Sequence, residues 1–110
     1  MKLPNREQAF VPPGKLENYL LSETHPVGGS KAKFLREAGF DKSNSTKLEE
    51  GLIGIAQNAD VVQVVETERG TKFVVDGIIL APSVRQISLR TVWIIEPSEE
   101  RPRFVTAYPT

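Results

Sequence analysis

The sequence has no cysteine, only one histidine and no long apolar run, and each absence excludes a class of protein. Without cysteine there is no disulfide, no thiolate nucleophile and no thiolate metal site. A single histidine leaves little from which to build a zinc or iron site, so we expect no metal and no other cofactor. No segment approaches the roughly 20 apolar residues that cross a bilayer, and the start lacks the apolar run of a signal peptide. We therefore expect a cytoplasmic protein without membrane contacts.

Net charge is also absent, because fourteen basic and fourteen acidic residues cancel. This balance argues against strong electrostatic binding of nucleic acid, but it allows an enzyme that holds a short RNA segment in a cleft. The chain contains no GxxxxGK[ST] or GxGxxG phosphate-binding motif and no GxSxG serine. At 110 residues, 39% of them hydrophobic, one domain over residues 1–110 is expected.

The first half of the chain has helical periodicity. Residues 1–14 are punctuated by prolines and predict an irregular lead-in, and residues 15–58 predict a helical half with three helices. The middle helix is followed by Gly39 and Phe40, which predict a Schellman ending in which Phe40 contacts Leu35.

The third helix carries an apolar stripe that is interrupted by two glycines. Its apolar positions are Leu48, Leu52, Ile55, Ala56 and Ala59. Gly51 and Gly54 each weaken a helix by about 1 kcal/mol relative to alanine. We interpret both glycines as a sign that this helix packs closely on a sheet.

Residues 60–108 change to strand character and predict four strands separated by turn signals. Asp76 and Gly77 predict a bulge or kink in the second strand. Helices followed by strands predict an α+β fold, in which three N-terminal helices pack on one face of a four-stranded antiparallel β-meander.

Two registers are possible for the last two strands. In the first, Thr91 and Trp93 share the face away from the helices with Thr106 and Tyr108. A slip of one residue instead places Arg90 and Val92 beside Thr106 and Tyr108. We favour the first register; in both, Thr106 and Tyr108 point the same way.

The only histidine, His25, lies in a Pro-Gly loop that leads into a helix carrying Lys31. Histidine has its charge change near neutral pH, and a lysine in a first helical turn is disfavoured by the macrodipole. A lone loop histidine is more often a surface residue, and a helical lysine is more often solvated. His25, Lys31, Thr106 and Tyr108 nevertheless form a metal-free set suited to acid–base chemistry on a phosphodiester.

The chain resembles a bacterial family of unknown function through His25–Phe34 with the following Gly-Phe pair, and through Thr91–Ile95 with Val105–Pro109. More loosely, it is similar to the ribonuclease-A-like toxin domains of the barnase–EndoU–colicin–RelE superfamily. That resemblance implies an RNA-cleaving site with His25, Thr106 and Tyr108. The basic residue is Lys31 by preference, with Arg36 and Arg90 as the next candidates.

The first hypothesis is a metal-independent, toxin-type ribonuclease that cleaves RNA through attack by the 2′-OH. His25 is the general base, Lys31 stabilises negative charge, Thr106 holds a phosphate oxygen, and Tyr108 binds phosphate or protonates the leaving group. Arg36, Arg90, Thr91 and Trp93 are supporting candidates. The expected partners are RNA and a small inhibitor protein.

Two alternatives stay open. In one, the chain is a non-catalytic protein-binding module anchored by Trp93, Phe104 and Tyr108. In the other, it is an immunity-type or structural protein with no site.

Overall fold

A computed structural model of the protein describes residues 1–21 and 29–110. The elements are η1 (Arg6–Gln8), η2 (Leu16–Leu20), α1 (Gly29–Glu37), η3 (Lys42–Asn44), α2 (Ser45–Asn58), β1 (Val61–Thr67), β2 (Gly70–Leu80), β3 (Gln86–Ile95) and β4 (Arg103–Pro109).

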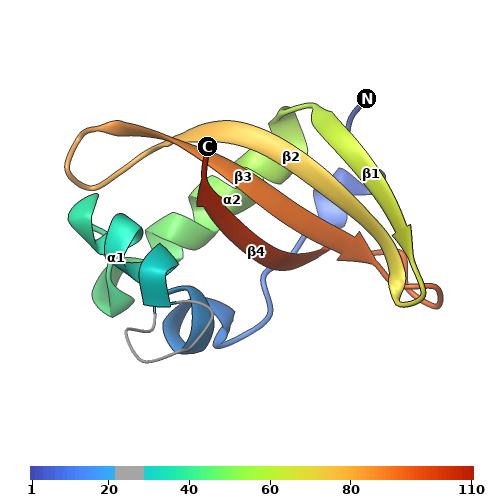
Figure 1. Cartoon of the computed structure of the whole chain (residues 1–110), viewed down its shortest axis with the longest axis horizontal. Coiled ribbons are helices and arrows are strands. Elements are labelled where there is room, and N and C mark those ends of the chain that lie inside the picture. The colour runs from blue at the N-terminus through green and yellow to red at the C-terminus, as the bar shows by residue number, and fades with distance from the viewer. Residues whose placement is uncertain (22–28) are drawn as a thin grey trace.

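The four strands form one antiparallel sheet in the order β1-β2-β3-β4, the predicted meander (Figure 1). A two-residue loop joins β1 to β2 and ends at Gly70, whose φ of 139° favours glycine. A Cβ on Gly70 would lie 2.4 Å from the carbonyl oxygen of Ile95, so this tight turn requires glycine. β2 and β3 are longer than the outer strands, and their joined end projects beyond β1 and β4.

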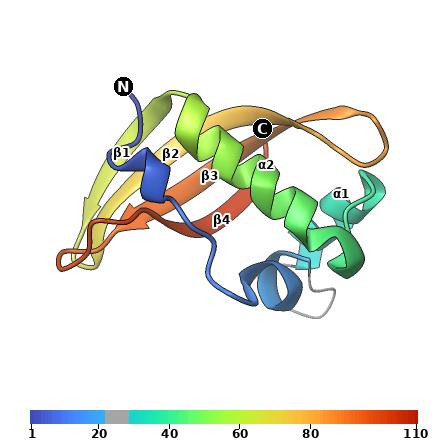
Figure 2. The same ribbon diagram turned by 180° about the vertical axis from the view of Figure 1, so that it is seen from behind.

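One long helix, α2, crosses one face of the sheet (Figure 2). Its predicted apolar stripe is buried at Leu48, Leu52, Ile55 and Ala56. Each of the buried leucine and isoleucine side chains contributes about 1.5–3 kcal/mol by leaving water. Facing it on β2, Phe73, Val75 and Ile79 are buried as well, so the core lies between α2 and the sheet.

The prediction of three N-terminal helices packed on one face of the sheet is wrong. The first predicted helix is a five-residue π-helical turn, η2, in which the Leu21 N–H donates to the Leu16 carbonyl at 2.6 Å. Pro12, Pro13 and Gly14 precede it, and so short a segment makes too few backbone hydrogen bonds to stabilise an α-helix.

The second predicted helix, α1, forms but does not cover the sheet. It lies beyond the end of the sheet, beside β4 and under the projecting β2–β3 turn (Figure 1). Of its described side chains only Leu35 is fully buried, so its apolar face is too narrow to cover several strands. Its predicted Schellman ending is confirmed, because the Phe40 N–H donates to Leu35 O at 3.0 Å and the Gly39 N–H donates to Arg36 O at 2.9 Å.

No bulge or kink interrupts β2 at Asp76 and Gly77, since β2 pairs with β3 without a break. Gly77 is instead required for close packing between α2 and β2. A Cβ at this position would lie 2.6 Å from the buried Ile55 side chain, so glycine lets α2 approach the strand closely.

Candidate functional site

The β3–β4 register places Arg90 opposite Tyr108 and Val92 opposite Thr106. The favoured register is therefore wrong, and the alternative with a one-residue slip is the one observed. Both faces of β3 are apolar here, because Ile94 and Trp93 are each nearly inaccessible, at 3% and 0% exposure. The alternation of apolar and polar residues along β3 therefore did not distinguish its two faces. In the structure, the larger Trp93 side chain lies in the core.

Thr91 and Trp93 form a buried hydrogen-bonded pair. The Trp93 Nε1–H donates to Thr91 Oγ1 at 2.8 Å, and the Thr91 hydroxyl donates to the Val75 carbonyl at 2.7 Å. Trp93 also packs edge-to-face on Phe104, with ring centroids 5.4 Å apart. Because Trp93 and Phe104 have no exposed surface, neither can anchor a protein partner. Thr91 and Trp93 can support a site only through the core.

On the face opposite α2, a polar row crosses three strands. Asp76 on β2 lies opposite Arg90 on β3, which lies opposite Tyr108 on β4. The Arg90 Nε and Nη2 donate to the two Asp76 carboxylate oxygens, each at 2.8 Å. These bonds hold the pKa of Asp76 below its ordinary range and raise the pKa of Arg90, to which Tyr108 adds a smaller effect. Arg90 is thus a fixed cation beside a partly exposed tyrosine.

Thr106 lies on this same face, next to the row, and its hydroxyl is hydrogen-bonded to Tyr19 Oη at 3.1 Å. Tyr19 comes from η2, and the Lys15 ammonium lies 4.3 Å from the centre of its ring. The N-terminal half of the chain therefore braces β4 at the position of a predicted site residue.

Of the remaining predicted residues, His25 lies outside the described residues. Lys31 is in the first turn of α1, the helix that lies beside β4, and Arg36 is exposed near the end of the same helix. In the described part of the chain, the structure thus brings together Arg90, Thr106 and Tyr108, with α1 nearby.

Sequence reasoning missed Asp76, Tyr19 and Lys15. The signal for Asp76 was a charged residue between the apolar runs 73–75 and 78–80 of one strand, which we interpreted as part of a kink. Tyr19 lies within the predicted helical half, and a tyrosine hydroxyl needs a polar partner when the side chain is half-buried.

The described residues hold no group of three His, Cys, Asp or Glu side chains placed to bind a metal ion. None of the described helices combines the length and apolar character needed to span a membrane.

The fold is shared with a solved structure. A chain of the contact-dependent growth inhibition toxin–immunity protein complex from Klebsiella pneumoniae 342 superposes with a TM-score of 0.72 over 96% of both chains, at 16% sequence identity. This similarity concerns the fold alone. No curated protein matches the sequence significantly. The model of one family matches residues 2–110, so the chain belongs to the family described as domain of unknown function DUF6883.

Proposed function

We propose that this chain is a toxin-type endoribonuclease domain that acts in the cytoplasm without a metal ion. The observation that supports it best is the convergence of Arg90, Thr106 and Tyr108 on one face of the sheet, next to the helix that carries Lys31. Guanidinium and hydroxyl groups are common ligands of phosphate oxygens. The similarity of the fold to a chain from a toxin–immunity complex supports the toxin assignment.

In the proposed reaction, His25 removes the proton of the 2′-OH, and the 2′ oxygen attacks the adjacent phosphorus. Arg90 and Lys31 stabilise the charge that develops on the non-bridging oxygens, and Thr106 donates a hydrogen bond to one of them. Tyr108 donates a proton to the departing 5′ oxygen, which breaks the P–O bond and leaves a 2′,3′-cyclic phosphate. Asp76 orients Arg90 through its two hydrogen bonds.

The test is cleavage of a labelled RNA in EDTA by the wild type and by His25→Ala. We expect cleavage that survives EDTA, products ending in 2′,3′-cyclic phosphate, and a loss of about 10²-fold or more in the variant, as for a general base. Lys33→Ala, which removes an exposed cation of α1 that has no role in the proposed site, is the matched control for charge removal. Cleavage that requires a divalent ion, or full activity in His25→Ala, would contradict the proposal.

A non-catalytic protein-binding role is the second candidate, and exposed apolar residues favour it. Ile78, Leu80 and Val84 are 61%, 66% and 82% exposed at the projecting end of β2 and β3. A toxin-type domain also requires an inhibitor in the cell that makes it, so these residues are compatible with both candidates. An RNA cleavage assay separates them, because a pure binding module leaves RNA intact.

A further inference from the structure

The segment Gly77–Leu80 of β2 has a strand on one side only. β3 pairs with β2 up to Leu80, whereas β1 begins at Val61, opposite Val75. In residues 1–21 and 29–110, no strand pairs with Gly77–Leu80 on the β1 side. The sheet therefore has a bare edge, about 14 Å long at the usual rise per residue.

Two residues of this edge direct their backbone groups outward. Gly70 closes the two-residue β1–β2 loop, where the closing pair exchanges both backbone hydrogen bonds. Every second residue of β2 counted from Gly70 therefore points its N–H and C=O toward the β1 side. The Ala81 N–H points the other way and donates to Arg85 O in the β2–β3 turn at 2.8 Å. At Asp76 the flanking Val61–Val75 pair already engages the outward backbone, so Ile78 and Leu80 present the N–H and C=O groups that can pair with another strand.

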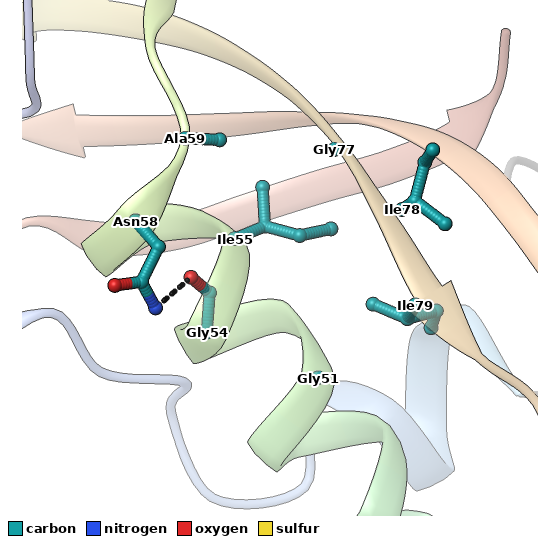
Figure 3. Close-up of a pocket in the computed structure, with 8 residues that line it drawn as sticks. All are labelled: Gly51, Gly54, Ile55, Asn58, Ala59, Gly77, Ile78 and Ile79. Atoms are coloured by element: carbon teal, nitrogen blue, oxygen red, sulfur yellow. Dashed lines mark hydrogen bonds between the residues drawn. The ribbon is translucent and has the colours of Figure 1, made fainter.

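A groove of about 430 Å³ lies between this edge and α2 (Figure 3). Three glycines line the groove, and two of them have a side chain packed against them. A Cβ on Gly51 would lie 3.0 Å from the Ile79 side chain, and a Cβ on Gly77 would lie 2.6 Å from the Ile55 side chain. Gly54 differs, because a Cβ there would have no neighbouring side chain within 4 Å. Gly54 therefore opens into the groove.

Two ion pairs involve residues that adjoin the lining of the groove in sequence. Arg90 holds Asp76 at 2.8 Å on the open face, and Lys2 holds Asp60 at 3.2 Å at the start of β1. No charged side chain lines the groove among the described residues. An uncharged, apolar occupant complements such a surface, whereas a charged one would lose hydration without gaining a partner.

The size of the edge argues against a second copy of this chain. A stable interface buries about 800 Å² on each partner. An edge of about 14 Å offers pairing for only a short strand, and the groove beside it accepts few side chains. A flexible segment of another protein can occupy it without a large rigid interface.

We infer that Gly77–Leu80 and the groove beside α2 bind an extended, uncharged segment of a partner protein. The segment adds to the sheet beside β2 through backbone hydrogen bonds and places an apolar side chain over Gly54. This surface lies on the far side of the sheet from β4 and does not depend on the proposed ribonuclease activity.

The probe is an N-acetylated, C-amidated peptide of about six alternating valine and threonine residues, long enough to span the edge. In NMR spectra of the full chain, we expect shifts confined to the amides of Gly77–Leu80 and of α2 around Gly54. Hydrogen exchange at Ile78 and Leu80 slows on binding. A peptide with proline at alternate positions, which cannot donate the required bonds, leaves the spectrum unchanged.

Gly54→Leu fills the groove from a position with space around it and is expected to weaken peptide binding about tenfold or more. Glu49→Leu adds the same side chain at an exposed position of α2 outside the groove and retains wild-type affinity. Ile78→Pro removes an outward N–H and weakens binding as well. Thermal unfolding of each variant checks that the fold is intact.

Binding of the peptide by Gly54→Leu with wild-type affinity would overturn the inference, as would shifts centred on other elements. An absence of shifts at millimolar peptide would do the same. A dimer in sedimentation equilibrium that Gly54→Leu dissociates would identify a second copy as the occupant and also overturn it. RNA cleavage by Gly54→Leu is measured separately, so a failure here is distinct from a failure of the proposed function.

Discussion

The two lateral edges of the sheet differ in how they are covered. Along β4, the Phe104 N–H donates to Phe10 O at 3.0 Å, and Tyr19 holds the Thr106 hydroxyl. Along Gly77–Leu80 of β2, by contrast, no strand within the described ranges covers the edge. A braced edge keeps side chains in fixed positions, as chemistry requires, whereas a bare edge offers backbone groups to a partner. The difference separates a candidate reaction site from a candidate docking site.

The largest effect is expected from Gly77→Ala, which places a methyl group against Ile55 beneath the bare edge. Because Ile55 is buried at 4% exposure, it cannot move aside freely, and such overpacking costs about 1–3 kcal/mol. Urea unfolding followed by circular dichroism measures the loss as a lower midpoint. Wild-type stability would show that α2 does not press on β2 as closely as described.

At the braced edge, Tyr19→Phe removes the hydrogen bond to Thr106 and keeps the ring. We expect the free energy of unfolding to fall by about 1 kcal/mol, the usual value for one such bond. A double-mutant cycle with Thr106→Val isolates this contact. Strictly additive effects of the two substitutions would mean that Tyr19 and Thr106 do not interact in solution.

Gly54→Ala is the matched control for Gly77→Ala, because it makes the same substitution where the added Cβ meets no neighbouring side chain. In a helix interior, alanine is more favourable than glycine by about 1 kcal/mol. Gly54→Ala should therefore stabilise the protein by a similar amount, measured by the same urea titration. A destabilised variant would mean that the groove is closed in solution.

The smallest effect concerns pH. Arg90 holds the pKa of Asp76 below its ordinary value of 3.8, so the folded state favours the ionised carboxylate. This stabilisation is present above the unfolded pKa and is lost as pH falls through the lower, folded pKa. Asp76→Asn should lose slightly more stability relative to the wild type at pH 7 than in strong acid. If the difference in free energy of unfolding between Asp76→Asn and the wild type is the same at both pH values, the ion pair is contradicted.

Much of the sheet was predictable, because four apolar runs separated by turn signals admit few arrangements other than a meander. The helices were less predictable. The apolar stripe of α2 is long enough to predict that this helix packs on the sheet. The positions of η2 and α1 depend instead on contacts with β4 and the β2–β3 turn, which lie far away in sequence. Periodicity does not report such contacts.

The candidate site was harder to predict, because it depends on register. Trp93 and Ile94 are both buried, so burial on both faces removed the alternation that normally fixes a strand. The roles of Gly51 and Gly54 were also only partly predictable from the sequence. Both were interpreted as close-packing glycines, and only Gly51 has a strand side chain against it.

An NMR titration with a short RNA that carries a 2′-deoxy nucleotide at the cleavage point tests the proposed site most directly. Such an RNA binds but cannot be cleaved by 2′-OH attack. The account predicts shifts at the amides of Arg90, Thr106 and Tyr108, and none at Ile78 and Leu80 on the bare edge. An absence of shifts along β4, or shifts centred on Gly77–Leu80, would contradict it.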